Sequence, residues 1–447
     1  MNRSTTGTTV DGGSALYPWY VVGVLMLAQT CSFIDRMIMG LLVGPVRATF
    51  GISDTQYSLL AGFAFSVFYA VMGLPLARIA DRGSRRTLIA AGITLWSLMT
   101  ALCGTARGFW GLFFARVGVG VGEATLSPAA FSMISDYFPR AVLARALSVF
   151  TLGVTFGSGL AYMIGGTVVA YVETLGTVVL PVLGQMHGWQ LTFLVVGLPG
   201  LLVAALMFTV REPERRGVSR AAPELSFAPL IRFVSLRKRA VLTHIFGVSI
   251  FIMVVFGINV WGPTYLIRTF GFDGARAGVY FGGIMMVAGT LGLLSGGLFA
   301  DRWYARGRRD AYSRVIMISA AIMAPCVLVI GLTGQLVTGL LALAAATYFS
   351  AFQGGIAGGT LQLMAPNELR GQLAALYFLC ANLIGLGLGP TVVAATTDYV
   401  FASDAAIGKS LALCAVVLCP LAVAIMWSGL AQVEQAISDA EQSAGPG

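Results

Sequence analysis

The sequence has few charged residues for its length. Only 11% of its 447 residues are charged, whereas a soluble domain carries about 25%. A water-soluble surface cannot be built from so few charges. Apolar stretches long enough to cross a hydrocarbon core of about 30 Å recur along the chain instead. We therefore expect the lipid bilayer to be its main solvent.

Patterns typical of metal binding and catalysis are also scarce. The two histidines, His187 and His244, lie far apart, and no two of the six cysteines form a C-x-x-C pair. The chain has no H-E-x-x-H and no G-x-S-x-G motif. The string Gly408-Lys409-Ser410 lacks the earlier glycine of a phosphate-binding loop. These absences argue against a membrane enzyme or an ATP-driven pump, and we expect neither a metal nor a cofactor.

The apolar stretches predict an all-α integral membrane protein, because backbone groups that face lipid have to be hydrogen-bonded internally. Twelve transmembrane helices are predicted in two six-helix bundles, over residues 18–44, 54–80, 87–106, 109–135, 142–172, 189–210, 241–268, 275–300, 313–333, 337–363, 371–395 and 408–430. The predicted divisions are a disordered N-terminal tail (1–17), an N-terminal bundle (18–210), a cytoplasmic linker (211–240), a C-terminal bundle (241–430) and a C-terminal tail (431–447).

Basic residues outnumber acidic ones by 28 to 19, but no aromatic platform is interleaved with them, so a nucleic-acid partner is not expected. Twenty-one lie in breaks on one side of the predicted spans, against five on the other. The positive-inside rule then places both termini and the linker in the cytoplasm. Arginine almost replaces lysine, which is typical of GC-rich bacterial genomes. We expect a monomer in a bacterial inner membrane.

A short motif occurs once in each half. Ala77-x-x-x-Asp81-Arg82-Gly83-Ser84-Arg85-Arg86 follows the second predicted span, and Gly297-x-x-x-Asp301-Arg302 follows the eighth, 220 residues later. The first copy resembles the G-x-x-x-D-R-x-G-R-R signature of the major facilitator superfamily, with Ala77 and Ser84 departing from it. The resemblance implies a transporter of two similar halves, with a site near the midplane where they meet.

These motifs predict a cytoplasmic gate. A carboxylate can cap a helix of the other half, and arginines can bind acidic groups or lipid phosphates, which would latch this side while the transporter faces outward. The alternative is that the charges only set topology. The candidate gate residues are Asp81, Arg82, Arg85, Arg86, Asp136, Arg145, Asp301 and Arg302.

Four charged residues lie near the middle of predicted spans, away from their ends: Asp35 and Arg36 in the first, and Arg116 and Glu123 in the fourth. A charge facing lipid at midspan costs about 2.5–3.5 kcal/mol, so we expect all four to line a cavity or one another. The seven-residue spacing puts Arg116 and Glu123 on one helix face about 10 Å apart along the axis, where their side chains could nearly meet.

The two carboxyls are candidate proton carriers. Burial disfavours the charged form of a carboxyl and a nearby arginine favours it, so a carboxyl subject to both effects can exchange protons near neutral pH. Asp35 or Glu123 would then be protonated in one facing state and deprotonated in the other. The alternative is a static ion-pair network that holds the first and fourth helices together.

Three segments narrow the resemblance to the Spinster branch: Phe33-Ile34-Asp35-Arg36, Arg116-Val-Gly-Val-Gly-Val-Gly122-Glu123-Ala124 and Phe156-Gly157-Ser158-Gly159-Leu160. This resemblance implies that Asp35 and Glu123 respond to protons. It also implies that Arg36 and Arg116 bind the anionic group of a lysophospholipid or a sphingosine-phosphate-like substrate.

The glycines of the same segments have a simpler role. We expect Gly118, Gly120 and Gly122 to allow close helix packing, since they lie at midspan and do not form a phosphate loop. The run from Gly153 to Gly157 is close to an antiporter motif, but Ser158 stands where that motif usually has proline. No transport direction follows from it.

The C-terminal half has charged side chains only at the ends of its predicted spans, and their interiors hold isolated polar groups among aromatic and methionine side chains. A cavity with one charged and one apolar wall suits an amphipathic substrate with a headgroup and a tail. We predict proton-coupled transport of such a lipid-like anion by alternating access, the alternative being a proton-coupled carrier of drugs or small organic anions. The further candidate binding residues are Asn259, Tyr265, Tyr348, Gln353, Tyr377 and Asn382.

Overall fold

The structure is a computed structural model that describes residues 16–181, 184–215, 228–366 and 369–444. It confirms twelve helical spans long and apolar enough to cross a membrane. Their bounds are Tyr17–Leu41, Asp54–Gly73, Arg85–Cys103, Phe109–Tyr137, Arg145–Thr174, Gly188–Met207, Lys238–Phe270, Gly274–Ala305, Ala311–Leu332, Leu336–Met364, Arg370–Phe401 and Asp404–Ser428. Residues 1–15, most of the predicted disordered tail, lie outside the described part of the chain.

The first six spans form the N-terminal half. Its α-helices are α1 (Tyr17–Met37), α2 (Val43–Phe50), α3 (Asp54–Ser58), α4 (Ala64–Arg82), α5 (Arg85–Cys103), α6 (Phe109–Glu123), α7 (Leu126–Tyr137), α8 (Arg140–Thr174), α9 (Gly188–Gly197) and α10 (Pro199–Met207). A two-stranded antiparallel hairpin, β1 (Val178–Leu180) and β2 (Gly184–Met186), lies between α8 and α9.

The last six spans form the C-terminal half. Its helices are α12 (Lys238–Phe270), α13 (Gly274–Ile284), α14 (Thr290–Ala305), α15 (Ala311–Leu332), α16 (Leu336–Phe352), α17 (Ile356–Met364), α18 (Arg370–Cys380), α19 (Gly389–Ala395) and α20 (Ile407–Ser428). Within the described residues, π-helical segments continue the eighth span at Met285–Gly289 and the eleventh at Ala381–Leu388 and Thr396–Phe401, as one does the second span of the N-terminal half at Leu59–Phe63.

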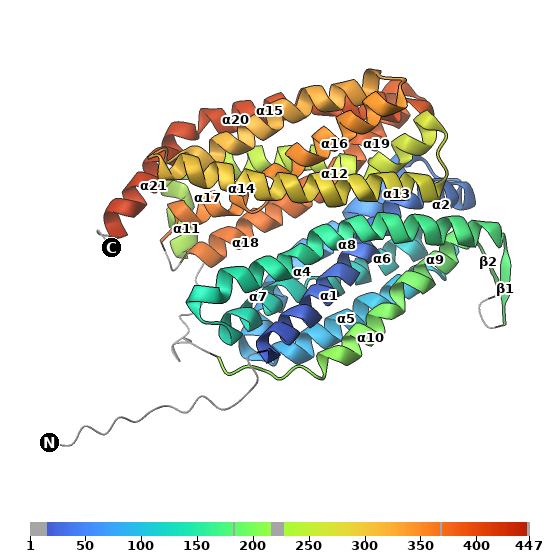
Figure 1. The fold of residues 1–447 in the computed structure, drawn as a ribbon, viewed down its shortest axis with the longest axis horizontal. Coiled ribbons are helices and arrows are strands. Elements are labelled where there is room, and N and C mark those ends of the chain that lie inside the picture. The colour runs from blue at the N-terminus through green and yellow to red at the C-terminus, as the bar shows by residue number, and fades with distance from the viewer. Residues whose placement is uncertain (1–15, 182–183, 216–227, 367–368, 445–447) are drawn as a thin grey trace.

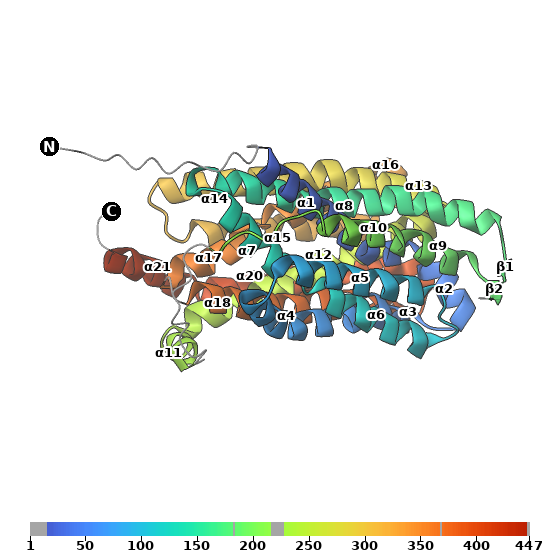
Figure 2. The same cartoon turned by 90° about the horizontal axis from the view of Figure 1, so that it is seen from below.

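The two halves lie side by side with their helices along the long axis (Figure 1). One end carries the start of α1 and the end of α20, and we call it the linker face; the other carries β1 and β2, and we call it the hairpin face. Helices α11 (Ala228–Leu236) and α21 (Leu430–Ala444) lie at the linker face in both views (Figures 1 and 2). The sequence analysis predicted neither of these two helices nor the hairpin.

Local sequence signals set several helix boundaries. Ser84 begins α5, because its hydroxyl accepts a hydrogen bond from the backbone N–H of Thr87. Ser53 and Gln56 form a reciprocal capping box at the start of α3. The long helix α12 ends at Gly271, whose φ of +67° is strained for residues with a side chain.

The fourth and tenth spans are both interrupted. The fourth changes from α6 to α7 at residues 124–125, just after Glu123, and the tenth changes from α16 to α17 at residues 353–355. Gly355 has a φ of +82°, which favours glycine and ends the first segment. The first of these breaks places Glu123 at the end of a helical segment, in the middle of the span.

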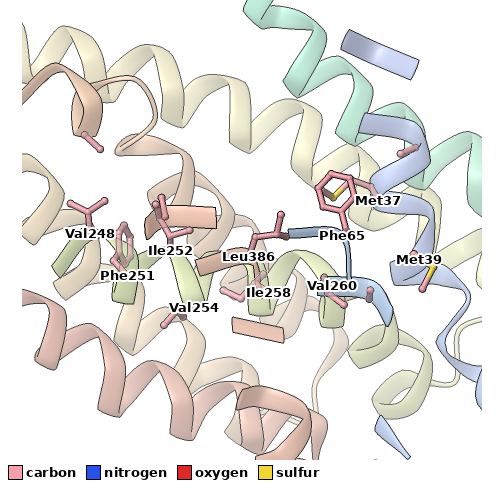
Figure 3. Packing of buried hydrophobic residues seen from close by; sticks show 14 of the residues in the cluster. Met37, Met39, Phe65, Val248, Phe251, Ile252, Val254, Ile258, Val260 and Leu386 are labelled. Carbon is pink, nitrogen blue, oxygen red and sulfur yellow. The ribbon is translucent and has the colours of Figure 1, made fainter. Parts of the chain in front are cut away.

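Buried apolar side chains of both halves belong to one continuous cluster. Figure 3 shows part of it, with Met37 and Phe65 from the N-terminal half and Ile258 and Leu386 from the C-terminal half. Backbone contact is close at this junction, since a Cβ at Gly62 would lie 2.8 Å from the carbonyl oxygen of Leu386. The halves therefore pack directly against each other through apolar groups.

Glycines allow α8 and α13 to cross at close range. A Cβ at Gly278 would lie 2.2 Å from the carbonyl oxygen of Tyr162 and 2.9 Å from the Cα of Gly166. A Cβ at Gly282 would lie 2.6 Å from the carbonyl oxygen of Gly159. Because these distances involve backbone atoms, the approach of the two halves here requires glycine.

Ion pairs join the halves at the hairpin face. Asp54 of the N-terminal half is fully buried and accepts two hydrogen bonds from Arg268 of the C-terminal half, at 2.5 and 2.8 Å. Arg47 lies 3.0 Å from Asp54 and 2.6 Å from Asp404 across the same junction. Asp398 accepts hydrogen bonds from the N–H and hydroxyl of Thr55, at 2.7 and 2.6 Å. The hairpin face is closed by these contacts.

At the linker face, several charged side chains pair within their own half. Arg85 pairs with Asp136 and with Glu212, all in the N-terminal half and its adjoining linker. In the C-terminal half, Asp301 accepts a hydrogen bond from Tyr312 at 2.7 Å, and Arg309 pairs with Glu441 at 2.8 Å. These pairs can persist when the halves separate at this end.

We expect Gly278→Ala to disfavour the closed hairpin face, because the new methyl group would overlap the backbone of α8. The matched control is Gly283→Ala in the same helix, where a Cβ would meet nothing within 4 Å and alanine would stabilise the helix by up to about 1 kcal/mol. Distances between spin labels at positions 107 and 409, in a background without native cysteines, would measure the effect. If Gly278→Ala kept the distances of the closed hairpin face, the α8–α13 crossing would not be required for its closure.

Asp54→Asn should open the same face, since it weakens the bonds to Arg268 and leaves two arginines short of a counter-charge. Removing one partner of a buried pair costs about 3–5 kcal/mol, so we expect a shift of tenfold or more toward the open distances. The control is Asp273→Asn, which removes a carboxylate that caps α13 within one half. Equal label distances in both variants would rule out a role for Asp54 in closure.

Candidate functional site

The candidate site is a cluster of four charged side chains buried between the first and fourth spans. Asp35 and Arg36 lie near the end of α1, and Arg116 and Glu123 lie on α6. All four are buried, with Arg116 at 0% exposure and Glu123 at 2%. The structure therefore supports the expectation that none of them faces lipid.

Glu123 is held by two donors from α1. Its Oε2 accepts a hydrogen bond from Arg36 Nη2 at 2.6 Å and another from the Ser32 hydroxyl at 2.7 Å. Ser32 and Arg36 are one helical turn apart, so they present their donors from the same face of α1. The other carboxylate oxygen, Oε1, bonds to no donor of the residues that the structure describes. The carboxylate is thus strongly bonded on one side and open on the other.

Aromatic rings surround the Arg36 guanidinium. Its central carbon lies 4.7 Å from the ring centre of Phe33, 4.5 Å from that of Phe65 and 5.0 Å from that of Tyr69. Phe65 and Tyr69 are four residues apart on α4 and stack on each other. These contacts stabilise a desolvated cation and fix the guanidinium against Glu123.

Arg116 differs from Arg36 in that its charge is not paired with a carboxylate of this cluster by a salt bridge. Its Nε donates a long hydrogen bond of 3.4 Å to the carbonyl oxygen of Leu60, and its guanidinium lies 5.3 Å from the Phe65 ring. Both terminal nitrogens, Nη1 and Nη2, are buried without a hydrogen-bond partner among the described residues. A buried cation without an acceptor is unstable unless another group neutralises it, so this position invites an anion or water.

Arg116 and Glu123, whose spacing would let their side chains nearly meet, form no ion pair with each other. The two residues share a helix face as their spacing indicated, but no ion pair joins them, and Glu123 bonds to Arg36 instead. The reason is tertiary: α1 crosses α6 beside Glu123 and brings Ser32 and Arg36 closer than Arg116, which is two turns away. The spacing could not reveal a partner from another helix.

Asp35 points toward the third span. Its Oδ2 accepts a 3.3 Å hydrogen bond from the hydroxyl of Thr100 on α5. No salt bridge to Asp35 is formed by any described residue, Arg36 and Arg116 included. A single hydroxyl is weak compensation for a buried carboxylate. Asp35 therefore has room for a proton or for a further donor.

The glycines of α6 serve packing, as expected. Cβ atoms at Gly118, Gly120 and Gly122 would lie 2.6 Å from Met99, 2.5 Å from the Phe65 carbonyl and 2.7 Å from the Trp96 amide, respectively. These close approaches bring α4 and α5 against α6. They thereby place Phe65 and Thr100 beside the charged residues.

Several residues of this site were missing from the sequence analysis. Ser32, Thr100, Phe65 and Tyr69 are common in membrane helices, and nothing in their local sequence marks them. One signal was available for Ser32, which lies one turn before Arg36 on the same face. The positions of the others depend on how three helices pack, so the pattern of a single helix could not identify them.

The C-terminal candidates are scattered. Among the described residues, no hydrogen bond joins any of these six to another or to the charged cluster. Tyr265 is fully buried between Gly339 and Gly408, inside its own half. Tyr348 bonds to the Ser295 hydroxyl at 2.7 Å, and Tyr377 is almost fully buried against Phe378.

The remaining three C-terminal candidates lie at a backbone contact between the halves, at a helix break and in a π-helical segment. Asn259 accepts a bond from the Tyr162 hydroxyl through its backbone carbonyl, at 2.5 Å, which is a contact between the halves. Gln353 precedes the break in the tenth span. The Asn382 side chain bonds to the Phe378 carbonyl at 2.7 Å and lies in a π-helical segment. All three are half-buried.

The predicted gate residues divide between two surroundings. Arg85 is buried and pairs with Asp136, and Arg86 approaches the Val210 carbonyl at 3.4 Å. Arg145, Asp301 and Arg302 are exposed. The side chains of Asp81 and Arg82 lie outside the described part of the structure. A latch between the halves is thus not formed in this conformation by the described gate residues.

Glu212 is a linker residue that the gate prediction did not include. It accepts hydrogen bonds from Arg85 Nε at 2.8 Å, from the Arg86 N–H at 2.8 Å and from the Ser84 hydroxyl at 3.1 Å. Partial burial raises the pKa of its carboxyl, but these three donors outweigh it and hold the pKa below its usual value. The ionised carboxylate ties the start of the linker to the motif after the second span.

Three carboxylates gather at the hairpin face, where oxygens of Asp54, Asp398 and Asp404 lie within 4.8 Å of one another. Arginines already neutralise two of these carboxylates, because Asp54 and Asp404 each pair with Arg47 and Arg268. Asp398 is bonded to Thr55. With these oxygens occupied, we assign no metal to the group.

Known proteins share this architecture. Residues 25–390 match the Major Facilitator Superfamily. An MFS-type efflux pump of Mycolicibacterium smegmatis is 30% identical over 388 residues, covering 85% of this chain and 84% of the pump. Protein spinster homolog 1 of Xenopus laevis is 26% identical over 399 residues, covering 85% of this chain and 73% of the relative.

A solved structure extends the comparison to three dimensions. It is that of a bacterial homologue of the human lysosomal transporter Spinster, in an inward-facing and unoccupied conformation. It is 25% identical, with a TM-score of 0.76, and the match covers 95% of this chain and 98% of that one. The protein is accordingly a multi-pass transporter and not an enzyme. The chain belongs to the Major Facilitator Superfamily, in which it is Spinster-like.

Proposed function

We propose that the protein is a proton-coupled secondary transporter that moves an amphipathic, anionic, lipid-like substrate by alternating access. The observation that carries this proposal is the Arg116 guanidinium, which is fully buried and whose two terminal nitrogens have no acceptor in the described part of the chain. An intramembrane cation of this kind is typical of a substrate pathway. The substrate class is a lysophospholipid or a sphingosine-phosphate-like molecule.

The topology follows from charge. Of the basic residues outside the span interiors, 21 lie at the linker-face breaks or in the adjoining tails, and five lie on the opposite side. The positive-inside rule therefore favours a cytoplasmic linker face in a bacterial inner membrane. With that orientation, a closed hairpin face corresponds to an inward-facing conformation. The similarity to a solved inward-facing structure supports this reading.

Glu123 is the best candidate for proton coupling. It is held by Arg36 on one oxygen and lacks a donor on the other. Protonation of Glu123 would weaken its bond to Arg36, and the freed guanidinium could then bind an anionic headgroup. In this exchange Arg36 changes its partner from Glu123 to the headgroup, so proton binding and substrate binding are linked. A static ion pair would not link them. Asp35, with one weak donor, is the second candidate.

The C-terminal half provides a surface for an apolar tail. Met285 and Met286 lie on the eighth span beside α8, where a Cβ at Gly159 would lie 3.0 Å from the terminal carbon of Met286. Flexible methionines adapt to chains of variable shape. A substrate with its headgroup at Arg116 and its tail along the C-terminal half would contact the charged side chains of one half and the apolar side chains of the other. Asn259 and Asn382 are candidate polar contacts between these two parts.

A carrier of drugs or small organic anions is the second candidate. It shares the fold and the proton-coupling carboxyl, and the Mycolicibacterium relative bears the name of an efflux pump. The two candidates differ in what Arg116 does. An anionic headgroup requires this cation, whereas a cationic drug would be repelled by it.

Glu123→Gln should abolish the response of transport to a pH gradient in proteoliposomes. Each coupled proton contributes about 1.4 kcal/mol per pH unit, or tenfold in substrate accumulation, and glutamine cannot carry the proton. Exchange without a gradient should continue. Glu434→Gln removes an exposed carboxylate on α21 and should leave the response intact. Gradient-driven accumulation that persists in Glu123→Gln would remove Glu123 from the coupling.

Arg116→Gln should lower the affinity for lysophospholipids by tenfold or more, since a charged hydrogen bond contributes about 1.5–3 kcal/mol. Folding should be retained, because the terminal nitrogens of this guanidinium bond to no protein acceptor. Binding is measured by tryptophan quenching with a lysophospholipid, a small organic acid and a cationic drug. Arg107→Gln, at an exposed arginine, is the control. Tighter binding of the cationic drug alone in Arg116→Gln would favour the second candidate.

A further inference from the structure

The linker face of the C-terminal half has a pocket that the transport site does not use. It lies where the loop after α14, the start of α15 and the end of α20 meet, and its volume is about 480 Å³. This is within the usual range for small-molecule sites. We call it the α14–α20 pocket. The residues that line it are Trp303, Arg306, Arg308, Arg314, Met317, Ile318, Ala321, Val423 and Trp427.

The rim of the pocket is strongly basic. Three arginines contribute to it, and none of the described lining residues is acidic. Arg314 bonds to Asp310 through its Nε at 2.5 Å. Arg306 and Arg308 have no carboxylate within ion-pair distance among the described residues, whereas their neighbour Arg309 pairs with Glu441. At least two guanidinium groups at the rim are therefore available to an anion.

The backbone turn after α14 brings two arginines to this rim. Arg306 ends the helix, and Gly307 follows with a φ of +87°, a conformation that favours glycine. The chain then folds back, with the Arg308 N–H bonded to the Trp303 carbonyl at 3.3 Å. A bulkier residue at position 307 would strain this turn. The turn thus presents Arg306 and Arg308 to the same pocket.

Two tryptophans lie beside the arginines. The Arg308 guanidinium lies 5.9 Å from the Trp303 ring, and the Arg314 guanidinium lies 5.8 Å from the Trp427 ring. Trp427 is 62% exposed, near the end of the twelfth span. Tryptophan is enriched at the level of lipid headgroups. The rim of the pocket therefore lies at the depth where phosphates of a bilayer are found.

The deeper wall is apolar. Met317, Ile318 and Ala321 follow Arg314 by three to seven residues along α15, and Val423 lies one turn before Trp427 on α20. A rise of 1.5 Å per residue puts this wall up to about 10 Å from the arginines. Ile318 and Ala321 are exposed on the side of the bundle. The pocket is thus basic at the headgroup level and apolar below it.

We propose that the α14–α20 pocket binds an anionic phospholipid of the surrounding leaflet, with its phosphate at the arginines and an acyl chain along α15. A guanidinium binds phosphate through paired hydrogen bonds, and basic pockets between transmembrane helices bind anionic headgroups. The site holds a resident lipid at the periphery of the C-terminal half. It does not depend on which substrate the central site transports.

Native mass spectrometry of the delipidated full-length protein tests this site. The protein is titrated with phosphatidylglycerol or with phosphatidylcholine of the same acyl chains. We expect at least one phosphatidylglycerol to bind fivefold or more tightly than phosphatidylcholine. The double variant Arg306→Gln/Arg308→Gln should lose this preference. The control Arg107→Gln/Arg276→Gln removes the same charge at exposed positions outside the pocket and should keep it.

Three results would overturn the proposal: no preference in the wild type, the preference unchanged in Arg306→Gln/Arg308→Gln, or an equal loss in both double variants. Millimolar inorganic phosphate distinguishes a lipid from a free anion. Displacement of the lipid by phosphate alone would indicate an anion site without an acyl-chain contact and would also overturn it. Arg116→Gln should retain the preference, which separates this site from the transport site.

Fluorescence locates the lipid independently. Phosphatidylglycerol brominated near its headgroup should quench tryptophan emission more than brominated phosphatidylcholine does. The selective part of this quenching should disappear in Trp303→Phe/Trp427→Phe, which removes both tryptophans of the pocket. It should persist in Trp110→Phe, a similarly exposed tryptophan (65%) outside the pocket. Loss in Trp110→Phe instead would place the selective lipid elsewhere and contradict the assignment.

Discussion

The ion pair between Arg36 and Glu123 sets the arrangement of the N-terminal half. Both charges lie in the low-dielectric interior of the bundle, where an unpaired charge is strongly unfavourable. Their contact joins α1 to α6, and Ser32 and the rings of Phe65 and Tyr69 complete the surroundings of the pair. Three helices are thereby fixed around one neutralised pair. Nearby, the terminal nitrogens of Arg116 bond to no acceptor among the described residues, so this guanidinium remains open to a further group.

The two faces of the molecule use charge in opposite ways. At the hairpin face, Arg268 and Asp54 pair across the halves, so opening this face requires buried pairs to separate. At the linker face, Arg85 pairs with Asp136 and Glu212 within one half, so separating the halves there breaks none of these bonds. The close crossing of α8 and α13 adds packing at the closed end. Charge and packing therefore favour the same conformation.

The twelve spans could be predicted because each is long and apolar, and the buried charges because ionisable residues are rare within them. Their partners could not be predicted. Sequence spacing related Arg116 to Glu123, but the crossing of α1 supplied Arg36 as the nearer partner. Tyr265 resembled a binding residue, yet it packs inside its own half. The pairing of Asp54 with Arg268 could not be predicted either. Asp54 is the first residue of α3, and a carboxylate at the start of a helix is common for purely local reasons.

A transporter that alternates between two facing states needs contacts of similar total free energy in both of them. Two conformations interconvert readily only when their free energies differ by a few kcal/mol. The pairs at Asp54 and the glycine contacts stabilise the closed hairpin face, so the opposite state needs comparable contacts at the linker face. A ligand shifts this balance only through its different affinity for the two states. The exchange of Arg36 between Glu123 and a substrate anion, as proposed above, would be such a difference, because it would change the contact that fixes α1 against α6. A change of ion-pair partner at the centre would then move α1 relative to α6, and these helices extend toward both faces of the molecule.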